Sequence, residues 1–234
     1  MPLTFGNLLA NNVDGATVGL SAADTPFPAA AGVFTLVSTS AEDNPGGGGV
    51  GTVNAEVIVE HGAGDCRIHK ENVAMDGLTP VSAFVGLGLG VLRIRKLIHA
   101  AAGDRDIPQP AGDIIASIGG TPAGRIVAGN GVSETCVFAV GSERRELLEW
   151  VAGSVFFSTA GQDDAKKARV QLQTRLPGAG WTNAGNPLPL SIVQSSLEQT
   201  FPTPFEMLPC TDIRVIVINP QGVVIDVYAG FNII

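Results

Sequence analysis

The sequence predicts an all-β protein made of two β-sandwich or jelly-roll-like units that follow an extended N-terminal arm. Glycine (30) and proline (15) are abundant among the 234 residues, which favours many turns over long helices. Hydrophobic residues make up 45% of the chain and charged residues 15%, which is enough apolar material for a packed core. Short runs rich in β-branched and aromatic residues recur between the turn residues, as in sandwich and barrel proteins.

Changes in composition divide the chain into three parts. Residues 1–31 are rich in Asn, Ala, Gly and Pro, which is typical of an arm that lies irregularly or along a neighbouring subunit. Residues 32–158 are expected to form a β-sandwich domain. Residues 159–234 are expected to form a smaller one, because the strand-and-turn pattern begins again after a polar break at residues 160–167.

The first domain begins with a β-rich segment at residues 32–39, followed by a loop at residues 40–49 that contains proline and four consecutive glycines. In residues 50–60, small apolar residues alternate with mostly polar ones, which indicates a strand with one wet face. Alternation in residues 92–95 predicts that the leucine and isoleucine face one side and the two arginines the other. Further strands are expected at residues 66–70, 73–75, 80–85, 92–99, 113–118, 124–128, 134–140 and 168–174.

Residues 142–150 are the one helix-like stretch. Ser142 is followed three residues later by Arg145 instead of Glu, which makes a poor capping box. The stretch also continues directly into the strand-like residues 151–158. A long strand is therefore favoured over a short helix.

The C-terminal part contains one expected core residue and one expected hairpin. Trp181 is expected to anchor the core, and the prolines within residues 187–189 limit that segment to an edge strand or a turn. Residues 212–218 and 222–231 are expected to pair as a hairpin, because Asn-Pro-Gln-Gly joins them.

Charge and hydropathy argue against two classes of partner. The net charge of −8 repels phosphate backbones, so no nucleic acid is expected to bind. The N-terminus lacks a basic region followed by an apolar core, so no secretory signal is expected. The longest apolar run, residues 83–92, is too short to span a bilayer, and no membrane partner is expected.

The cysteines and histidines do not predict a metal site. Cys66, Cys136 and Cys210 are far apart and odd in number, and are expected to behave as small buried hydrophobic residues. His61, Cys66 and His69 form the one cluster of histidine and cysteine in the sequence. A structural zinc site needs a fourth ligand, and none is evident, so no metal and no cofactor are expected.

Catalytic motifs are equally weak, and the chain is not expected to be an enzyme. The glycine run at residues 45–52 lacks the Lys-Ser/Thr ending of a phosphate-binding loop and precedes a strand instead of a helix. The glycines of residues 86–90 have the wrong spacing for a dinucleotide fingerprint, and no serine lies in a Gly-x-Ser-x-Gly elbow. The remaining carboxylate groups are interpreted as solvated turns or polar strand faces: Asp104, Asp106, Asp163, Asp164, Glu143, Glu146 and Glu149.

Two stretches carry a resemblance to a known group of proteins. The first stretch, which covers residues 32–155, contains Gly32-Val-Phe-Thr-Leu-Val-Ser-Thr-Ser-Ala-Glu-Asp43, Met75-Asp-Gly-Leu-Thr-Pro-Val81, Arg125-Ile-Val-Ala-Gly-Asn130 and Phe138-Ala-Val-Gly141. The order of these segments resembles a family of virion structural proteins of tailed bacteriophages. The second stretch contains Val170-Gln-Leu-Gln173, Gly180-Trp181 and Ile213-Arg-Val-Ile-Val217, and is similar to small β-sandwich modules of phage head-decoration and tail-accessory proteins.

The resemblance implies a non-enzymatic virion protein, made in the host cytoplasm, that serves as a capsid decoration or cement protein or as a head–tail accessory component. Its expected partners are other virion proteins, such as the major capsid, tail or portal proteins, and further copies of itself. The alternative is a β-sandwich module that binds a carbohydrate or a host surface. The candidate partner contacts are apolar residues near the two ends of the chain, namely Phe5, Leu8, Leu9, Phe231, Ile233 and Ile234. For the C-terminal residues, burial in a strand of their own domain is the competing interpretation.

Overall fold

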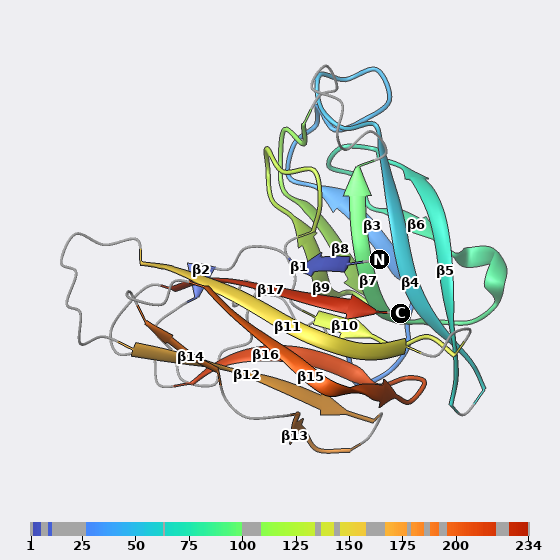
Figure 1. The fold of residues 1–234 in the computed structure, drawn as a ribbon. Coiled ribbons are helices and arrows are strands. Elements are labelled where there is room, and N and C mark those ends of the chain that lie inside the picture. Colours follow the sequence, from blue (N-terminus) through green and yellow to red (C-terminus); the bar gives the residue numbers. More distant parts are fainter. Residues whose placement is uncertain are drawn as a thin grey trace. The chain divides into compact units, whose positions relative to one another are not determined.

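The computed structural model of the chain consists of two compact units (Figure 1). The terminal unit contains the described parts of residues 1–20, 135–140 and 144–234, and the central unit contains those of residues 21–134 and 141–143. The structure describes residues 2–5, 9–10, 27–62, 64–99, 109–133, 137–142, 146–157, 167–176, 179–184, 188–191, 196–218 and 225–233.

Regular structure in the described residues is almost entirely β. It comprises seventeen strands and one 3-10 helix, η1 (Val85–Leu87), and every strand pairing is antiparallel. The all-β prediction is thereby confirmed. The helix-like stretch is strand from residue 146 onward, within β11 (Glu146–Phe157), so the preference for a long strand is also confirmed.

The central unit contains two sheets. One has the order β6-β3-β8-β9 and the other the order β5-β4-β7. Their strands are β3 (Phe34–Ser38), β4 (Thr52–Gly62), β5 (Asp65–Ala74), β6 (Val81–Ala83), β7 (Val91–His99), β8 (Ile114–Ile118) and β9 (Thr121–Ile126). The strands expected at residues 80–85, 92–99, 113–118 and 124–128 occur with shifted ends, whereas those expected at 66–70 and 73–75 form one continuous strand, β5.

Both central sheets contribute side chains to one hydrophobic core. In β4 the residues Val53, Ala55, Val57 and Val59 are completely buried, as the alternation in the sequence predicts. The other sheet supplies fully buried side chains from each of its three longer strands, including Leu36, Ile114 and Ile126. Burial of this apolar surface is the main favourable term for folding of the unit.

The alternation predicted for β7 is wrong in one respect. Its core residues are Val91, Ile94 and Leu97, which are three residues apart instead of two. The register between β4 and β7 shifts twice and skips Leu92 and Arg95. Each skipped residue adds one position to β7, and this moves the following side chains to the other face.

The terminal unit also contains two sheets. One has the order β1-β17-β11-β15 with β2 paired to β17, and the other has the order β10-β16-β12-β13 with β14 paired to β12. Their strands, besides β11, are β1 (Pro2–Phe5), β2 (Leu9–Ala10), β10 (Val137–Ala139), β12 (Lys167–Arg175), β13 (Thr182–Asn183), β14 (Leu188–Ser191), β15 (Ser196–Met207), β16 (Asp212–Ile218) and β17 (Ile225–Ile233).

The hairpin expected at the C-terminus does not form. Strand β16 pairs with β10 and β12, whereas β17 pairs with β1, β2 and β11 in the other sheet. The Asn-Pro-Gln-Gly segment predicts only a local reversal of the chain. It does not determine which strands β16 and β17 form hydrogen bonds with. The prediction that the prolines restrict residues 187–189 to an edge strand or a turn is confirmed. Strand β14 pairs only with β12 among the described strands, and is therefore an edge strand.

Candidate functional site

The predicted contact residues near the chain ends lie in one sheet of the terminal unit. Strand β1 pairs with β17 so that Phe5 lies opposite Ala229 and Leu3 opposite Phe231. Strand β2 continues this pairing, with Leu9 opposite Asp226, and the other edge of β17 pairs with β11, with Ile233 opposite Leu148. The backbones of these predicted contact residues therefore pair within their own chain. Two of the predicted contact residues, Leu8 and Ile234, lie outside the described residues.

A projecting apolar loop in the central unit is the strongest candidate for a contact surface. It leads from β6 through η1 to β7, and its two ends flank the start of β3. Phe34 pairs with Ala83 before the loop, and Gly32 exchanges two backbone hydrogen bonds with Val91 after it. Val33 thus lies at the base of the loop. We call Val33, Val85 and Leu89 the apolar tip.

Phe84 fixes the direction of this loop. Its backbone adopts a left-handed conformation, with φ of 60°, and its ring packs edge-on against Phe34 at 5.3 Å between centroids. The Phe84 backbone N–H donates to Oε2 of Glu71 at 2.7 Å. A left-handed conformation is costly for a bulky residue and persists only where the surroundings enforce it. The loop is therefore held by the core.

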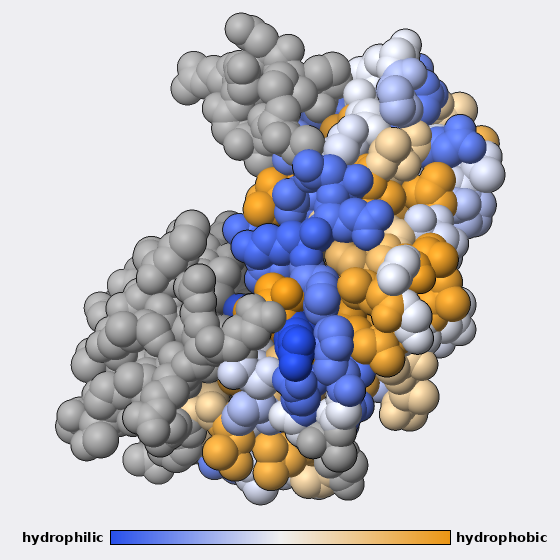
Figure 2. All heavy atoms as spheres, turned by 90° about the vertical axis from the view of Figure 1, so that its right-hand side faces the viewer, coloured by the Kyte–Doolittle hydropathy of each residue, from blue (hydrophilic) through white to orange (hydrophobic). Residues whose placement is uncertain are grey.

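The side chains of the apolar tip remain exposed in spite of this anchoring. Val85 is 71% exposed, Val33 62% and Leu89 40%, whereas Leu87 packs partly against the core. On the face of the molecule drawn in Figure 2, hydrophobic residues gather beside a band of hydrophilic ones. An apolar loop that is anchored in the core, and whose side chains are exposed in the described part of the chain, is typical of a surface used for contact with another protein.

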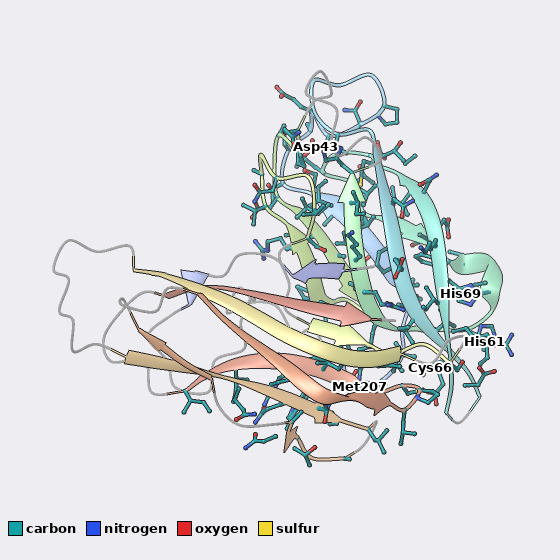
Figure 3. All side chains as sticks on the ribbon, in the orientation of Figure 1. Asp43, His61, Cys66, His69 and Met207 are labelled. Carbon is teal, nitrogen blue, oxygen red and sulfur yellow. The ribbon has the colours of Figure 1, made fainter. Side chains whose placement is uncertain are left out.

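A buried carboxylate organises the glycine-rich loop before β4. Asp43 is completely buried and accepts hydrogen bonds from the Ser38 hydroxyl (2.5 Å) and from the backbone N–H groups of Val50 (2.8 Å), Ala111 (2.9 Å) and Gly112 (3.0 Å). Burial alone would raise the pKa of Asp43, but these hydrogen bonds outweigh burial and lower the pKa below its ordinary value. The group is structural. It is labelled in Figure 3.

The histidine and cysteine cluster of the sequence is brought together only in part. The Nε2 atoms of His61 and His69 lie 2.9 Å apart, and Figure 3 shows both residues on the β4–β5 hairpin. Cys66 lies on the opposite face of β5 from His69, because the two residues are three positions apart in a strand whose side chains alternate. Cys66 is also disulfide-bonded and is therefore no metal ligand.

The expectation of buried thiols needs a correction. Cys66 and Cys210 are buried, with 0% and 3% exposure, but each of them is disulfide-bonded. An odd number of dispersed cysteines thus does not exclude disulfide bonding. Cys136 lies outside the described residues.

Trp181 is not the core anchor that the sequence predicts. It is only half-buried, beside β13, and the guanidinium groups of Arg175 and Arg214 lie over its ring at 4.5 Å and 4.1 Å from the centroid. Arg175 also pairs with Asp212 at 3.0 Å, and Arg214 donates to Gln173 at 2.9 Å. Burial and then the nearby charge of Arg175 lower the pKa of Arg214. Trp181 is thus part of a polar strand face.

The remaining candidates are metal-binding clusters, membrane-spanning helices and the other carboxylates noted in the sequence. Within the described ranges, no group of three or more His, Cys, Asp or Glu residues is arranged to hold a metal ion. No helix of the described part is long and apolar enough to cross a membrane. Several carboxylates considered in the sequence lie outside the described residues, namely Asp104, Asp106, Asp163, Asp164 and Glu143.

Sequence reasoning did not identify the apolar tip. In the sequence, residues 86–90 have the wrong spacing for a nucleotide-binding loop and belong to an apolar run too short to span a bilayer, and they are not interpreted as a contact surface. The signal that points to it is the alternation of apolar residues with glycines in residues 85–90, because apolar residues in a glycine-rich loop have no core face of their own to occupy.

Comparisons with known proteins add no assignment. The chain matches no protein-family model, and neither the curated proteins nor the solved structures contain a match to it.

Proposed function

We propose that the chain is a non-enzymatic structural protein of a tailed-phage virion, a capsid decoration or head–tail accessory component that binds other virion proteins and copies of itself. Its two units are, in this proposal, β-sandwich or jelly-roll-like modules. The single observation that carries the proposal is the apolar tip, in which exposed Val85 and Leu89 lie on a loop anchored in the core and exposed Val33 lies at the base of that loop.

A contact made through the apolar tip has a clear energetic basis. Covering apolar surface stabilises a complex by about 25 cal/mol per Å² removed from water. A loop already held in one conformation also loses little entropy on binding. The left-handed Phe84, its edge-on contact with Phe34 and its hydrogen bond to Glu71 supply this pre-organisation.

The buried carboxylates support a structural role. Asp43 joins two segments of backbone and the Ser38 side chain, and Asp212, whose side chain is 2% exposed, pairs with Arg175. A general acid or base needs access to a substrate atom, and these groups already use their oxygens within the fold.

The direct test is the composition of purified particles. Phage particles from a lysed culture of the source are separated on a density gradient, and the particle band is analysed by quantitative peptide mass spectrometry. We expect the chain in many copies per particle, and the copy number distinguishes a capsid decoration from a tail ring. Absence of the chain from clean particles would overturn the proposal.

A second test addresses the apolar tip itself. Substituting Val85→Asp together with Leu89→Asp places two charges on the proposed contact, and incorporation into particles is expected to fall at least tenfold. The matched control is Leu78→Asp, at a residue that is 60% exposed in the turn between Asp76 and Thr79 of the same unit. Equal incorporation of both variants would contradict a role for the apolar tip.

One observation favours the alternative of carbohydrate or host-surface binding. Trp181 is half-buried, and Gln173 and Asn183 lie opposite each other on the neighbouring strands β12 and β13. An aromatic ring beside amide groups offers both stacking and hydrogen bonding to a polar ligand. The two guanidinium groups over the ring reduce the space for a sugar, so this function ranks second. Specific binding on a glycan array, lost in Trp181→Ala, would favour it.

A further inference from the structure

His61 and His69 converge because of the register of the β4–β5 hairpin. His69 lies opposite Val57, and the pairing continues to Glu60 opposite Cys66 and Gly62 opposite Asp65. The register therefore skips His61, as at a β-bulge, which changes the direction of a side chain relative to a regular strand. The His61 ring reaches back along the hairpin to the ring of His69 (Figure 3).

The two rings meet head to head. Their Nε2 atoms are 2.9 Å apart, their centroids 5.1 Å apart, and their planes differ by 22°. The centroid separation exceeds the nitrogen separation by roughly two ring radii, so each Nε2 points toward the other. One ring donates its Nε2–H to the lone pair of the other ring, as the tautomers of neutral imidazole permit.

We propose that this histidine pair is a binding site for a divalent transition-metal ion, and that Cu²⁺ and Ni²⁺ are the ions it suits. Imidazole nitrogen binds such ions at about 2.0–2.1 Å. Two nitrogens at that distance and at a right angle to each other are about 2.9 Å apart, whereas a tetrahedral angle separates them by about 3.3 Å. The present 2.9 Å is the length of the hydrogen bond between the two rings, and it shows that the hairpin brings both Nε2 atoms within the range that either geometry requires.

Binding needs only a local movement. His61 is exposed and His69 half-buried, so rotation about the side-chain torsions turns both Nε2 lone pairs toward one point outside the hairpin. The proton between the rings passes to Nδ1 of the donor ring, so both rings remain neutral and the ion replaces the shared hydrogen bond. Water completes the coordination shell.

Among the described residues, the neighbouring groups leave the site with two protein ligands. Cys66 is disulfide-bonded and on the other face of β5. The carboxylate of Asp65 already accepts hydrogen bonds from Arg67 and from the Ser142 hydroxyl. A site with two imidazole ligands binds less tightly than a closed structural zinc site, and the order of affinity for divalent ions places Cu²⁺ first.

An ion held by both histidines would link β4 to β5 near the turn of the hairpin. The unfolded chain has no preformed pair of ligands, so binding stabilises the folded state in proportion to the logarithm of the ion concentration above the dissociation constant. This effect does not depend on the role proposed for the chain in a virion.

The test uses Cu²⁺ and the full-length chain. Calorimetric titration is expected to show a wild-type site that is weakened at least tenfold in His61→Ala and in His69→Ala. Electron paramagnetic resonance of this site is expected to show coupling to two nitrogens. The control, Lys70→Ala, changes the exposed residue next to His69 on the opposite face of β5 and is expected to bind as the wild type does.

A second measurement separates binding from a change in folding. Ni²⁺ is expected to raise the Tm of the wild type and of Lys70→Ala, but not that of the His61→Ala, His69→Ala double variant, whose metal-free circular dichroism spectrum should match the wild type. The proposal is overturned if the wild type binds no copper, or if the double variant binds copper as tightly as the wild type.

Discussion

The hydroxyl of Ser38 donates to Oδ2 of Asp43 at 2.5 Å, which links the last residue of β3 to the buried carboxylate of the following loop. The same carboxylate accepts backbone N–H groups from Val50 and from residues 111–112, which are distant in the sequence. One side chain thus joins the end of β3, the approach to β4 and the approach to β8. Without it, the donors of the buried residues Ser38, Val50 and Gly112 would be left unsatisfied.

We therefore predict that Asp43→Ala lowers the free energy of unfolding by about 3 kcal/mol or more, because removal of one acceptor leaves several buried donors unpaired. Asp43→Asn should cost less, since its side-chain oxygen still accepts from one side of the site. Urea unfolding followed by circular dichroism measures both changes. A loss below about 0.5 kcal/mol for Asp43→Ala would show that water replaces the carboxylate at no cost.

Acid should reduce the contribution of Asp43. Its pKa is lowered in the folded state, so its stabilising effect is present above the ordinary pKa of aspartate, about 3.9, and is lost as the pH falls through the folded value. The difference in unfolding free energy between the wild type and Asp43→Asn should therefore be constant from about pH 7 to pH 5 and shrink below about pH 4. A difference that stays constant down to pH 3 would contradict this assignment.

Gly112 gives an independent test of the same loop. A Cβ atom on Gly112 would lie 2.6 Å from the backbone nitrogen of Ser40 and 2.6 Å from Oγ1 of Thr39, closer than atoms pack. Gly112→Ala is expected to destabilise the chain by about 2 kcal/mol, because the backbone at Ser40 must move. Gly48→Ala is the control. Its nearest neighbour is Oε2 of Glu42 at 3.6 Å, and its effect should stay within about 0.5 kcal/mol.

The sequence predicted the all-β class and most strand positions because these depend on local signals. The alternation of valine and alanine with polar residues in β4 is one such signal, and all four small apolar side chains are buried. The faces of β7 were predicted incorrectly because two register shifts skip Leu92 and Arg95, and no local signal marks a bulge in an apolar-basic stretch.

Contacts between distant segments could not be predicted in the same way. The separation of β16 and β17 into different sheets depends on the strands that each one meets, and the connecting turn has the same sequence in either case. Similarly, the contact between His61 and His69 arises from a skipped residue near the hairpin turn. The sequence shows that the residues are close along the chain, but it does not show the direction of their rings.

The contact of Trp181 with two arginines gives the last prediction. Each guanidinium over the ring is expected to contribute about 0.5–2 kcal/mol, depending on its exposure to water. Trp181→Ala should therefore lower the free energy of unfolding by about 2–3 kcal/mol. Trp181→Phe should lower it by less, because a smaller aromatic face remains.

The measurement is urea unfolding followed by circular dichroism, because the chain has only two tryptophans and the substitution alters the fluorescence signal. Leu176→Ala is the control, at a residue close in sequence that is 42% exposed, and it should change stability by less than about 0.5 kcal/mol. If Trp181→Ala changed stability as little as this control does, the arginine contacts would contribute nothing measurable. The ring would then be available to a ligand, which would favour the carbohydrate-binding alternative over a purely structural role for this face of β12 and β13.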